Sequence, residues 1–147
     1  MKKNQILITA GTDYKKITKE ILEEADLQSH IMDRTKKIGI KPNLVSPSEA
    51  SWGATTHPEV VAGIIEYLKE RGFSDIVMME GSWVGDKTNE AVEVCGYDRL
   101  SKEYQVPFWD MQKDKGVPVD CGGMELNICE RVREIDFLIN VPVLKGH

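Results

Sequence analysis

The sequence is poor in cysteine and contains no paired cysteine motif. Its three cysteines, Cys95, Cys121 and Cys129, form no C-x-x-C pair. The first residues lack the apolar core and cleavage site of a signal peptide, and no apolar run approaches the roughly 20 residues of a membrane span. An odd number of cysteines without an export signal is typical of reduced thiols. We therefore expect a cytoplasmic protein without a membrane segment.

An excess of basic residues is missing too. The 147 residues carry 19 Lys and Arg against 24 Asp and Glu, which gives a formal net charge of −5. Nucleic acids and anionic membranes both need a basic binding surface, so neither is expected as a partner. The length is that of one domain with a sizeable core, and we expect residues 1–147 to form a single domain.

The common nucleotide-binding motifs are absent as well. No G-x-G-x-x-G occurs, so a Rossmann cofactor site has no support. The stretch from Gly81 to Thr88 lies between a predicted strand and a predicted helix, as a P-loop does, but it is one spacer short. Asp86 stands directly before Lys87 and would place a carboxylate where the phosphate should bind. We therefore do not expect a triphosphate site.

The sequence does contain a well-marked βαβ unit between residues 36 and 82. Ile38–Ile40 and Ile76–Met79 are short apolar runs that predict buried strands. Thr56 and Glu59 match a capping box at the start of a helix, and Gly72 fits the left-handed position after its end. The apolar face of that helix is predicted by residues at helical spacing, namely Val60, Val61, Ile64, Ile65 and Leu68.

This unit predicts the location of a site. In a parallel βαβ unit the strands end at the same edge of the sheet, and open α/β sheets bind ligands at that edge. Polar side chains follow both strands and precede the helix. We expect the following residues to gather there: Lys41, Asn43, Thr55, Thr56, Glu80 and Ser82.

The other segments predict strands and helices in alternation. Strands are expected at 6–10, 106–111 and 137–144, helices at 14–27, 88–95 and 98–104, a short polar helix or turn at 130–134, and a hairpin at 117–120 and 124–128. This alternation favours an α/β fold, specifically a three-layer sandwich around a mainly parallel sheet with one antiparallel hairpin.

A second strand end has a composition similar to the first. Asn140, Pro142 and Lys145 follow the last apolar run, as Lys41, Pro42 and Asn43 follow an earlier one. Proline cannot donate a hydrogen bond to a sheet, so both prolines are expected where the ladder breaks. These ends are either plain strand terminators with solvated lysines or two parts of one site.

Four stretches carry a family resemblance. Their order along the chain resembles the family catalogued as domain of unknown function 362, and the likeness extends from Ile6 to the last residue. The stretches are Ile40–Val45 (IKPNLV), Thr55–Val61 (TTHPEVV), Glu80–Ser82 (EGS) and Asn140–His147 (NVPVLKGH).

The resemblance implies that the chain is the N-terminal α/β portion of a protein roughly twice as long. The chain stops directly after an apolar strand-like run, which agrees with this, so the C-terminal part is an expected partner. Many members of the family carry a ferredoxin-like insert with iron–sulfur clusters, but this chain has no C-x-x-C-x-x-C run. The family is distantly similar to the lactate racemase group, which uses Lys and His at an inter-domain site. It has no settled activity to transfer.

The first hypothesis is a site for a small anion, phosphate or carboxylate, which is either catalytic or purely a binding site. A helix N-terminus offers free N–H groups and a partial positive charge to such a ligand. The reactive candidates are Glu80, Lys145 and His147. The binding candidates are Lys41, Asn43, Thr55, Thr56, Ser82 and Asn140.

Two alternatives remain open. A metal site is conceivable because His57, Glu80, Asp110 and His147 are ligand types near predicted element ends, although no pair has a tight ligand spacing. The other alternative is a non-enzymatic scaffold, one half of an iron–sulfur redox protein whose cofactor lies elsewhere. The sequence identifies no cofactor and no reaction.

Overall fold

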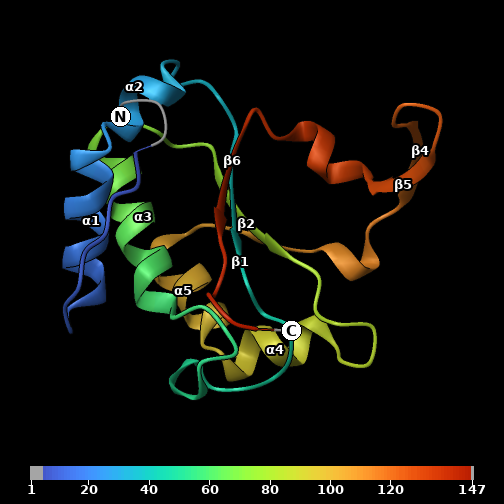
Figure 1. Ribbon diagram of the computed structural model, residues 1–147, viewed down its shortest axis with the longest axis horizontal. Coiled ribbons are helices and arrows are strands. Elements are labelled where there is room, and N and C mark those ends of the chain that lie inside the picture. Colours follow the sequence, from blue (N-terminus) through green and yellow to red (C-terminus); the bar gives the residue numbers. More distant parts are fainter. Residues whose placement is uncertain (1–4, 147) are drawn as a thin grey trace.

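A computed structural model of the chain describes residues 5–146. Its centre is a sheet of four parallel strands, which we call sheet A, in the order β3-β2-β1-β6 (Figure 1). The strands are β1 (Ile38–Pro42), β2 (Ile76–Glu80), β3 (Phe108–Asp110) and β6 (Phe137–Val141). The expectation of an α/β fold with a parallel sheet is therefore confirmed.

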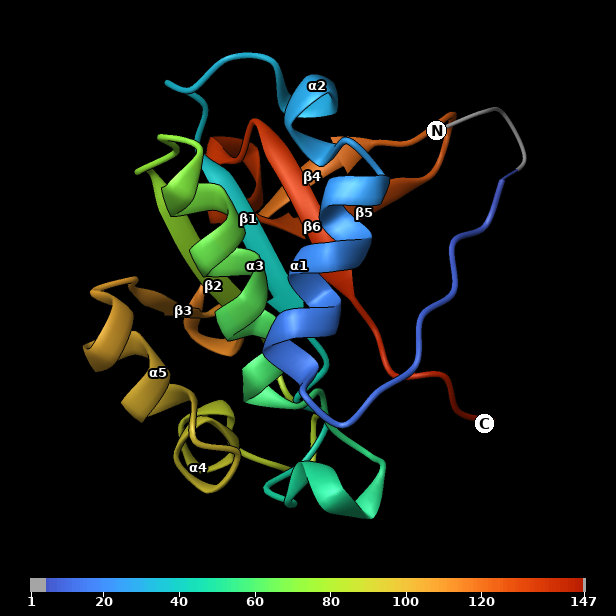
Figure 2. The same cartoon turned by 90° about the vertical axis from the view of Figure 1, so that its left-hand side faces the viewer.

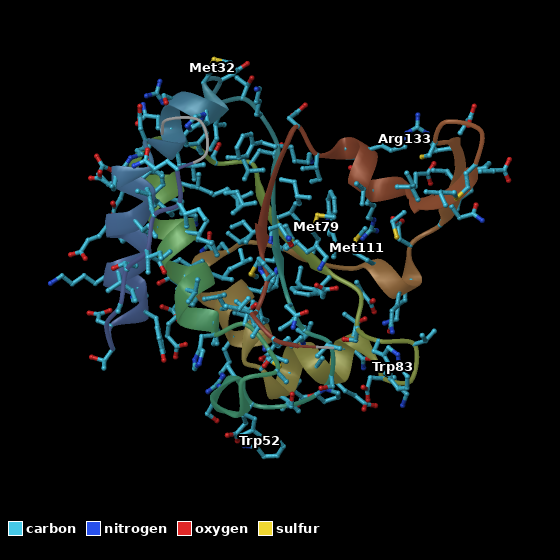
Figure 3. The ribbon with its side chains drawn as sticks, in the orientation of Figure 1. Met32, Trp52, Met79, Trp83, Met111 and Arg133 are labelled. Atoms are coloured by element: carbon cyan, nitrogen blue, oxygen red, sulfur yellow. The ribbon has the colours of Figure 1, made fainter. Side chains whose placement is uncertain are left out.

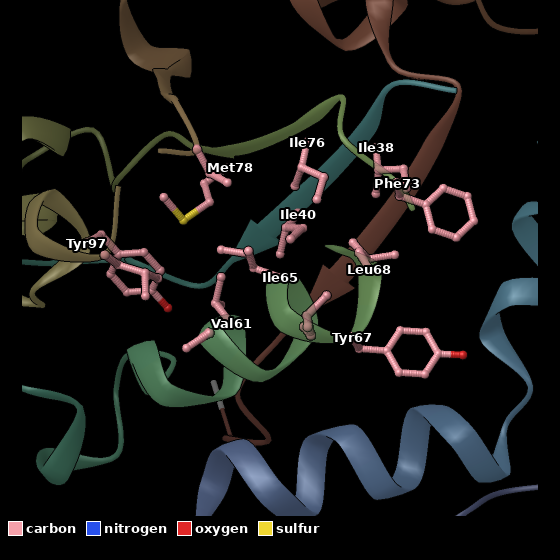
Figure 4. Close-up of a cluster of buried hydrophobic side chains, with 14 of the residues drawn as sticks. Ile38, Ile40, Val61, Ile65, Tyr67, Leu68, Phe73, Ile76, Met78 and Tyr97 are labelled. Carbon is pink, nitrogen blue, oxygen red and sulfur yellow. The ribbon is translucent and has the colours of Figure 1, made fainter. Parts of the chain in front are cut away.

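The predicted βαβ unit is present. β1 and β2 are paired in parallel with Ile38 opposite Ile76, and α3 (Pro58–Glu70) connects them. The apolar face of α3 is buried against the sheet together with Tyr97 from a later helix (Figure 4). Gly72 follows the helix with φ +83°, a conformation that glycine adopts without steric cost. Local periodicity was sufficient to predict this unit.

The start of α3 differs from the expected capping box. The N-cap residue is His57, which makes no side-chain capping bond, and Pro58 occupies the first helical turn. The Thr56 hydroxyl instead accepts the N–H of Asn43 at 2.9 Å and donates to the carbonyl of Val141 at 2.7 Å. The capping-box prediction was wrong because two strand ends compete for this hydroxyl, and sequence spacing does not reveal them.

Helices cover one face of sheet A. α1 (Tyr14–Glu24) packs beside α3, and α5 (Tyr97–Tyr104) lies beyond α3 on the same side (Figures 1 and 2). The helix predicted over 14–27 is divided, since Asp26 has φ +50° and α2 (Leu27–Ile31) begins after it. α4 (Thr88–Val94) precedes α5, as expected. The helical layer and the sheet enclose the apolar core.

The opposite face of the sheet is approached by the predicted hairpin and a short helix. β4 (Gly116–Asp120) and β5 (Glu125–Cys129) form the antiparallel hairpin, and η3 (Glu130–Glu134) follows. A Cβ on Gly39 would come within 3.1 Å of Ile135, so the chain passes close over β1 on this side. Met79 and Met111 extend into the space between the sheet and the hairpin (Figure 3).

The predicted first strand is absent from sheet A. Residues 6–10 are extended but belong to no strand of the described chain, and Ile6 and Ile8 are 82% and 90% exposed. The sheet ends at β6, and in the structure these residues are not paired with it. The prediction of a strand at residues 6–10 is therefore not borne out by this structure.

Cys95 lies in the core, whereas Cys121 is exposed and Cys129 is partly buried. All three are free thiols. Burial raises the pKa of the Cys95 thiol, and its Sγ lies 3.2 Å from the carbonyl oxygen of Ser48. Within residues 5–146, no helix has both the length and the apolar character needed to cross a membrane.

A polar cluster joins the three packed helices α1, α3 and α5. Glu66 of α3 accepts hydrogen bonds from the Tyr104 hydroxyl at 2.6 Å and from Lys15 Nζ at 2.9 Å. These two donors, Tyr104 first, hold the pKa of Glu66 below its ordinary value of 4.5. The carboxylate form is therefore favoured by folding.

This cluster predicts a loss of stability in acid. Because the folded-state pKa of Glu66 lies below its unfolded-state value, its stabilisation is complete above about pH 4.5 and disappears as the pH falls through the folded-state pKa. Urea unfolding between about pH 6 and pH 3 gives the free energy of unfolding as a function of pH. As the pH falls over this range, that free energy should decrease less for Glu66→Gln than for the parent. Glu20→Gln, on the exposed face of α1, is the control, and its free energy of unfolding should decrease with falling pH as much as that of the parent does.

Candidate functional site

An ion pair occupies the carboxyl edge of sheet A. Lys41, near the end of β1, places its Nζ 2.5 Å from Glu80 Oε2 at the end of β2. The other oxygen of Glu80 accepts the Gly81 N–H at 2.8 Å. The Glu80 side chain is only 8% exposed and the Lys41 side chain is 41% exposed. A nearly buried carboxylate is thus joined to a cation that reaches solvent.

The sheet register extends this pair into a polar row. Lys41 lies opposite Asn140 of β6, and Glu80 lies opposite Asp110 of β3. Asn140 is exposed. Asp110 is bound to Lys113 at 3.0 Å and caps the backbone of Gln112 at 3.0 Å. The open part of the row is therefore on the β1–β6 side, where Lys41 and Asn140 are neighbours in the sheet register.

Lys145 returns to the same edge from beyond β6. Its Nζ donates to the carbonyl of Ala54 at 2.9 Å, and the side chain of Asn43 donates to the same carbonyl at 2.7 Å. The two strand ends of similar composition are therefore linked through one loop oxygen. The expectation that Lys145 belongs to this edge depended on β6 lying next to β1, and the structure places it there.

The other predicted binding residues are engaged internally. Asn43 and Thr56 tie the end of β1 to the end of β6, as described above. The Thr55 hydroxyl donates to Ser48 at 2.9 Å, and the Ser82 hydroxyl donates to Leu44 at 2.6 Å. Thr55, Thr56 and Ser82 are buried. These side chains hold the loops that carry the exposed donors, and their role in ligand binding stays a prediction.

Thr56→Val tests how much the two hydrogen bonds of the Thr56 hydroxyl contribute to the free energy of unfolding. The substitution keeps the shape of the side chain but leaves the Asn43 N–H and the Val141 carbonyl without their partner. Leaving a buried polar group unpaired costs about 1–3 kcal/mol, so for two groups we expect the free energy of unfolding to fall by at least about 2 kcal/mol. Denaturant unfolding measures this, with the exposed Thr12→Val as control. A loss no larger than that of the control would contradict the bridge.

One positioning residue could not have been predicted. The side-chain amide of Gln112 accepts the Thr88 N–H at 3.0 Å and donates to the carbonyls of Ser82 at 2.9 Å and Asp86 at 3.0 Å. It fixes the loop between β2 and α4 that follows Glu80. A glutamine two residues after a short strand has no distinctive sequence signal.

The candidate metal ligands are not brought together in the described chain. His57 stacks against Tyr14 with ring centroids 4.5 Å apart, and Glu80 and Asp110 are bound to lysines. No group of three or more His, Cys, Asp or Glu side chains suited to a metal occurs within residues 5–146. His147 lies outside the described residues, so its proposed roles stay predictions.

A groove on the described surface lies away from this edge. This groove of about 330 Å³ runs between α3 and α5 beside the first turn of α1, with Lys15, Glu59, Arg99 and Tyr104 among its lining residues. Its cations and carboxylates balance, and none of the predicted site residues lines it. The groove and the sheet-edge row are therefore two separate features of the described surface.

Residues 38–147 match the family described as Domain of unknown function (DUF362). The match begins with β1 and covers the whole carboxyl edge. The chain belongs to the DUF362 family. Neither the curated proteins nor the solved structures gave a match. Family membership confirms the resemblance inferred from the sequence and assigns no reaction to this DUF362 chain.

Proposed function

We propose that the carboxyl edge of sheet A binds a small anion, either a phosphate or a carboxylate. The support comes from two lysines that reach this edge from neighbouring strands, Lys41 from β1 and Lys145 from beyond β6. Asn140 adds an exposed amide beside Lys41. Lys41 and Asn140 lie on paired strands, which limits the backbone conformational entropy that ligand binding would remove.

The local charge favours an anion weakly. Lys41 and Lys145 carry two positive charges and Glu80 one negative charge, so this group has a net charge of +1. α3 begins at the same edge and adds the partial positive charge of a helix N-terminus. Both lysines already have partners, so an anion has to compete with Glu80 for Lys41. We therefore expect a modest affinity for the anion, so high ligand concentrations are needed to detect binding.

Glu80 is the residue of the proposed site that could take part in a reaction. It is the nearly buried carboxylate of the row, and its hydrogen bond to Lys41 is short, 2.5 Å. A ligand that takes Lys41 as its counter-ion frees one oxygen of Glu80 to accept a proton from that ligand. The proposed reaction class is removal of a proton from the bound ligand, with the Glu80 carboxylate as the base that accepts the proton and Lys41 as the cation that orients the anionic group.

A thermal shift of the chain against inorganic phosphate, acetate and oxalate tests the proposal. A ligand present at one hundred times its Kd stabilises the folded state by about 2.7 kcal/mol. For a chain of this size, that amounts to a rise in Tm on the order of several degrees. We expect at least one of these anions to produce such a shift and chloride at equal ionic strength to produce none.

Variants of Lys145 test whether the anion that raises the Tm binds at this edge. Lys145→Met should remove most of the shift, and Lys145→Arg should keep it because the cation remains. Lys115→Met is the matched control, since it removes the same charge from an exposed position before the hairpin. If Lys145→Met and Lys115→Met change the shift equally, the anion is responding to overall charge and the site is not at this edge.

A non-enzymatic scaffold is the second candidate function. It is favoured by the internal engagement of Asn43, Thr55, Thr56 and Ser82, which leaves few free donors at the edge. In this case the chain is one half of an iron–sulfur redox protein and supports a cofactor held elsewhere. It predicts a folded, colourless chain whose Tm responds to no anion and no divalent metal.

A further inference from the structure

α1 has the position of a crossover helix whose first strand is missing from the sheet. Tyr14, at its start, stacks on His57 at the start of α3, and Glu23, near its end, binds Arg71 just past the end of α3. The two helices therefore run in the same direction on the same face of sheet A. α3 connects β1 to β2, but α1 leads into β1 with no strand before it in the sheet.

The handedness of crossovers fixes where that strand belongs. Parallel βαβ connections are right-handed in nearly all cases, so helices on one face advance across the sheet in one direction. α3 advances from β1 towards β2, away from β6. A strand that leads through α1 to β1 must therefore start on the β6 side of β1. β6 occupies the adjacent position, which leaves the open edge of β6.

This edge is unprotected in the described chain. β6 is paired only with β1, so its outer row of N–H and C=O groups has no ladder partner. Its five residues, FLINV, carry no charge and no proline, and Leu138 is 48% exposed. Natural sheets usually protect an edge by charge, proline, a bulge or a covering segment. β6 has none of the first three.

The segment before α1 has the properties of the missing strand. Residues 6–10, ILITA, are rich in residues that favour strands, and both isoleucines are almost fully exposed. In the structure the segment runs alongside α1 in the helical layer, and it descends towards the start of α1 as β6 descends to the carboxyl edge (Figures 1 and 2). Its direction is therefore that of a parallel partner for β6.

We propose that residues 6–10 bind the open edge of β6 as a fifth parallel strand of sheet A. Gly11, Thr12 and Asp13 then form the short turn into α1, which Asp13 already caps through Lys16 at 3.1 Å. Docking buries the two isoleucines and brings the Gly11–Thr12 turn to the carboxyl edge beside Asn140. The proposal does not depend on the anion site.

Amide hydrogen exchange on the full chain tests this assignment. An edge strand bonds through alternate amides, so alternate residues of 6–10 and the outward amides of β6 should exchange on the order of a hundredfold more slowly than an unstructured peptide. Ile8→Pro, which removes an amide and breaks the ladder, should abolish protection in both segments. Ile8→Ala keeps the backbone donor and should retain partial protection.

Protection that is unchanged on dilution supports docking within one chain. Protection that is lost on dilution, together with a change to a dimer in size-exclusion chromatography, would assign the edge to a second copy and overturn the proposal. Exchange of residues 6–10 at the rate of an unstructured peptide would overturn it as well. Ile8→Pro should leave the amides of β1 and β2 protected, which shows that the variant remains folded.

Discussion

Replacing Gly63 with valine should lower the free energy of unfolding by about 3 kcal/mol, the upper end of the usual range for overpacking. Gly63 lies on the face of α3 that packs against α1. A Cβ on this residue would stand 2.8 Å from the carbonyl oxygen of Lys15 and 2.9 Å from the Cβ of Thr18. Neither atom is at the end of a flexible side chain, so α1 has to move away from α3.

The alanine variant is the sharper control. In an exposed helix interior, Gly→Ala stabilises by about 1 kcal/mol because alanine is the better helix former. Here the contact with Lys15 and Thr18 should reverse that sign, so Gly63→Ala should be less stable than the parent and more stable than Gly63→Val. Chemical denaturation measures all three. An alanine variant as stable as the parent would show that the helices are not packed this closely.

Lys41→Ala should destabilise the fold by about 2 kcal/mol, and adding Glu80→Gln should restore most of the loss. Among the described residues, removing the lysine leaves this nearly buried carboxylate with the Gly81 N–H as its remaining hydrogen-bond donor, and an unpaired buried charge is costly. The partial exposure of Lys41 keeps the expected loss below that of a fully buried pair. Glutamine at position 80 removes the charge and keeps the hydrogen-bond acceptor.

A double-mutant cycle measured by urea unfolding separates this coupling from the individual effects. Lys113→Ala breaks the neighbouring pair with Asp110, in which the lysine is 72% exposed, and is expected to cost less than about 1 kcal/mol. If Lys41→Ala costs no more than Lys113→Ala, or if Glu80→Gln gives no recovery, the two side chains do not form the pair described. Any binding test on Lys41 should therefore use the Glu80→Gln background.

The βαβ unit could be predicted because its signals are local. Apolar runs mark β1 and β2, helical spacing marks α3, and Gly72 marks the helix end, so each element is specified by its own residues. The hairpin was predictable for the same reason, since Gly122 and Gly123 supply its positive φ angles. Local sequence patterns do not reveal hydrogen bonds between residues that are distant in sequence. The Thr56 hydroxyl bridges two strands distant in sequence, and no spacing rule contains that information.

The site was predictable only in part. Lys41 and Glu80 follow from the rule that parallel strands end at one edge, and they form an ion pair there. Lys145 and Asn140 join them only because β6 lies beside β1, and the order of strands in a sheet is not written in any one strand. Residues 6–10 do have the composition of a strand, but in this structure they are not paired with the sheet.

The measurement that tests the central claim most directly is a titration of the ¹⁵N-labelled chain with inorganic phosphate, and in parallel with oxalate, followed by amide chemical shifts. Binding at the proposed site should move the amides of Lys41, Asn43, Ala54, Asn140 and Lys145 with one common Kd, and Lys145→Met should weaken these shifts while Lys115→Met leaves them intact. If neither anion moves these amides, or if the shifts cluster at Arg99 and Lys15 in the groove between α3 and α5, the carboxyl edge of sheet A is not an anion site.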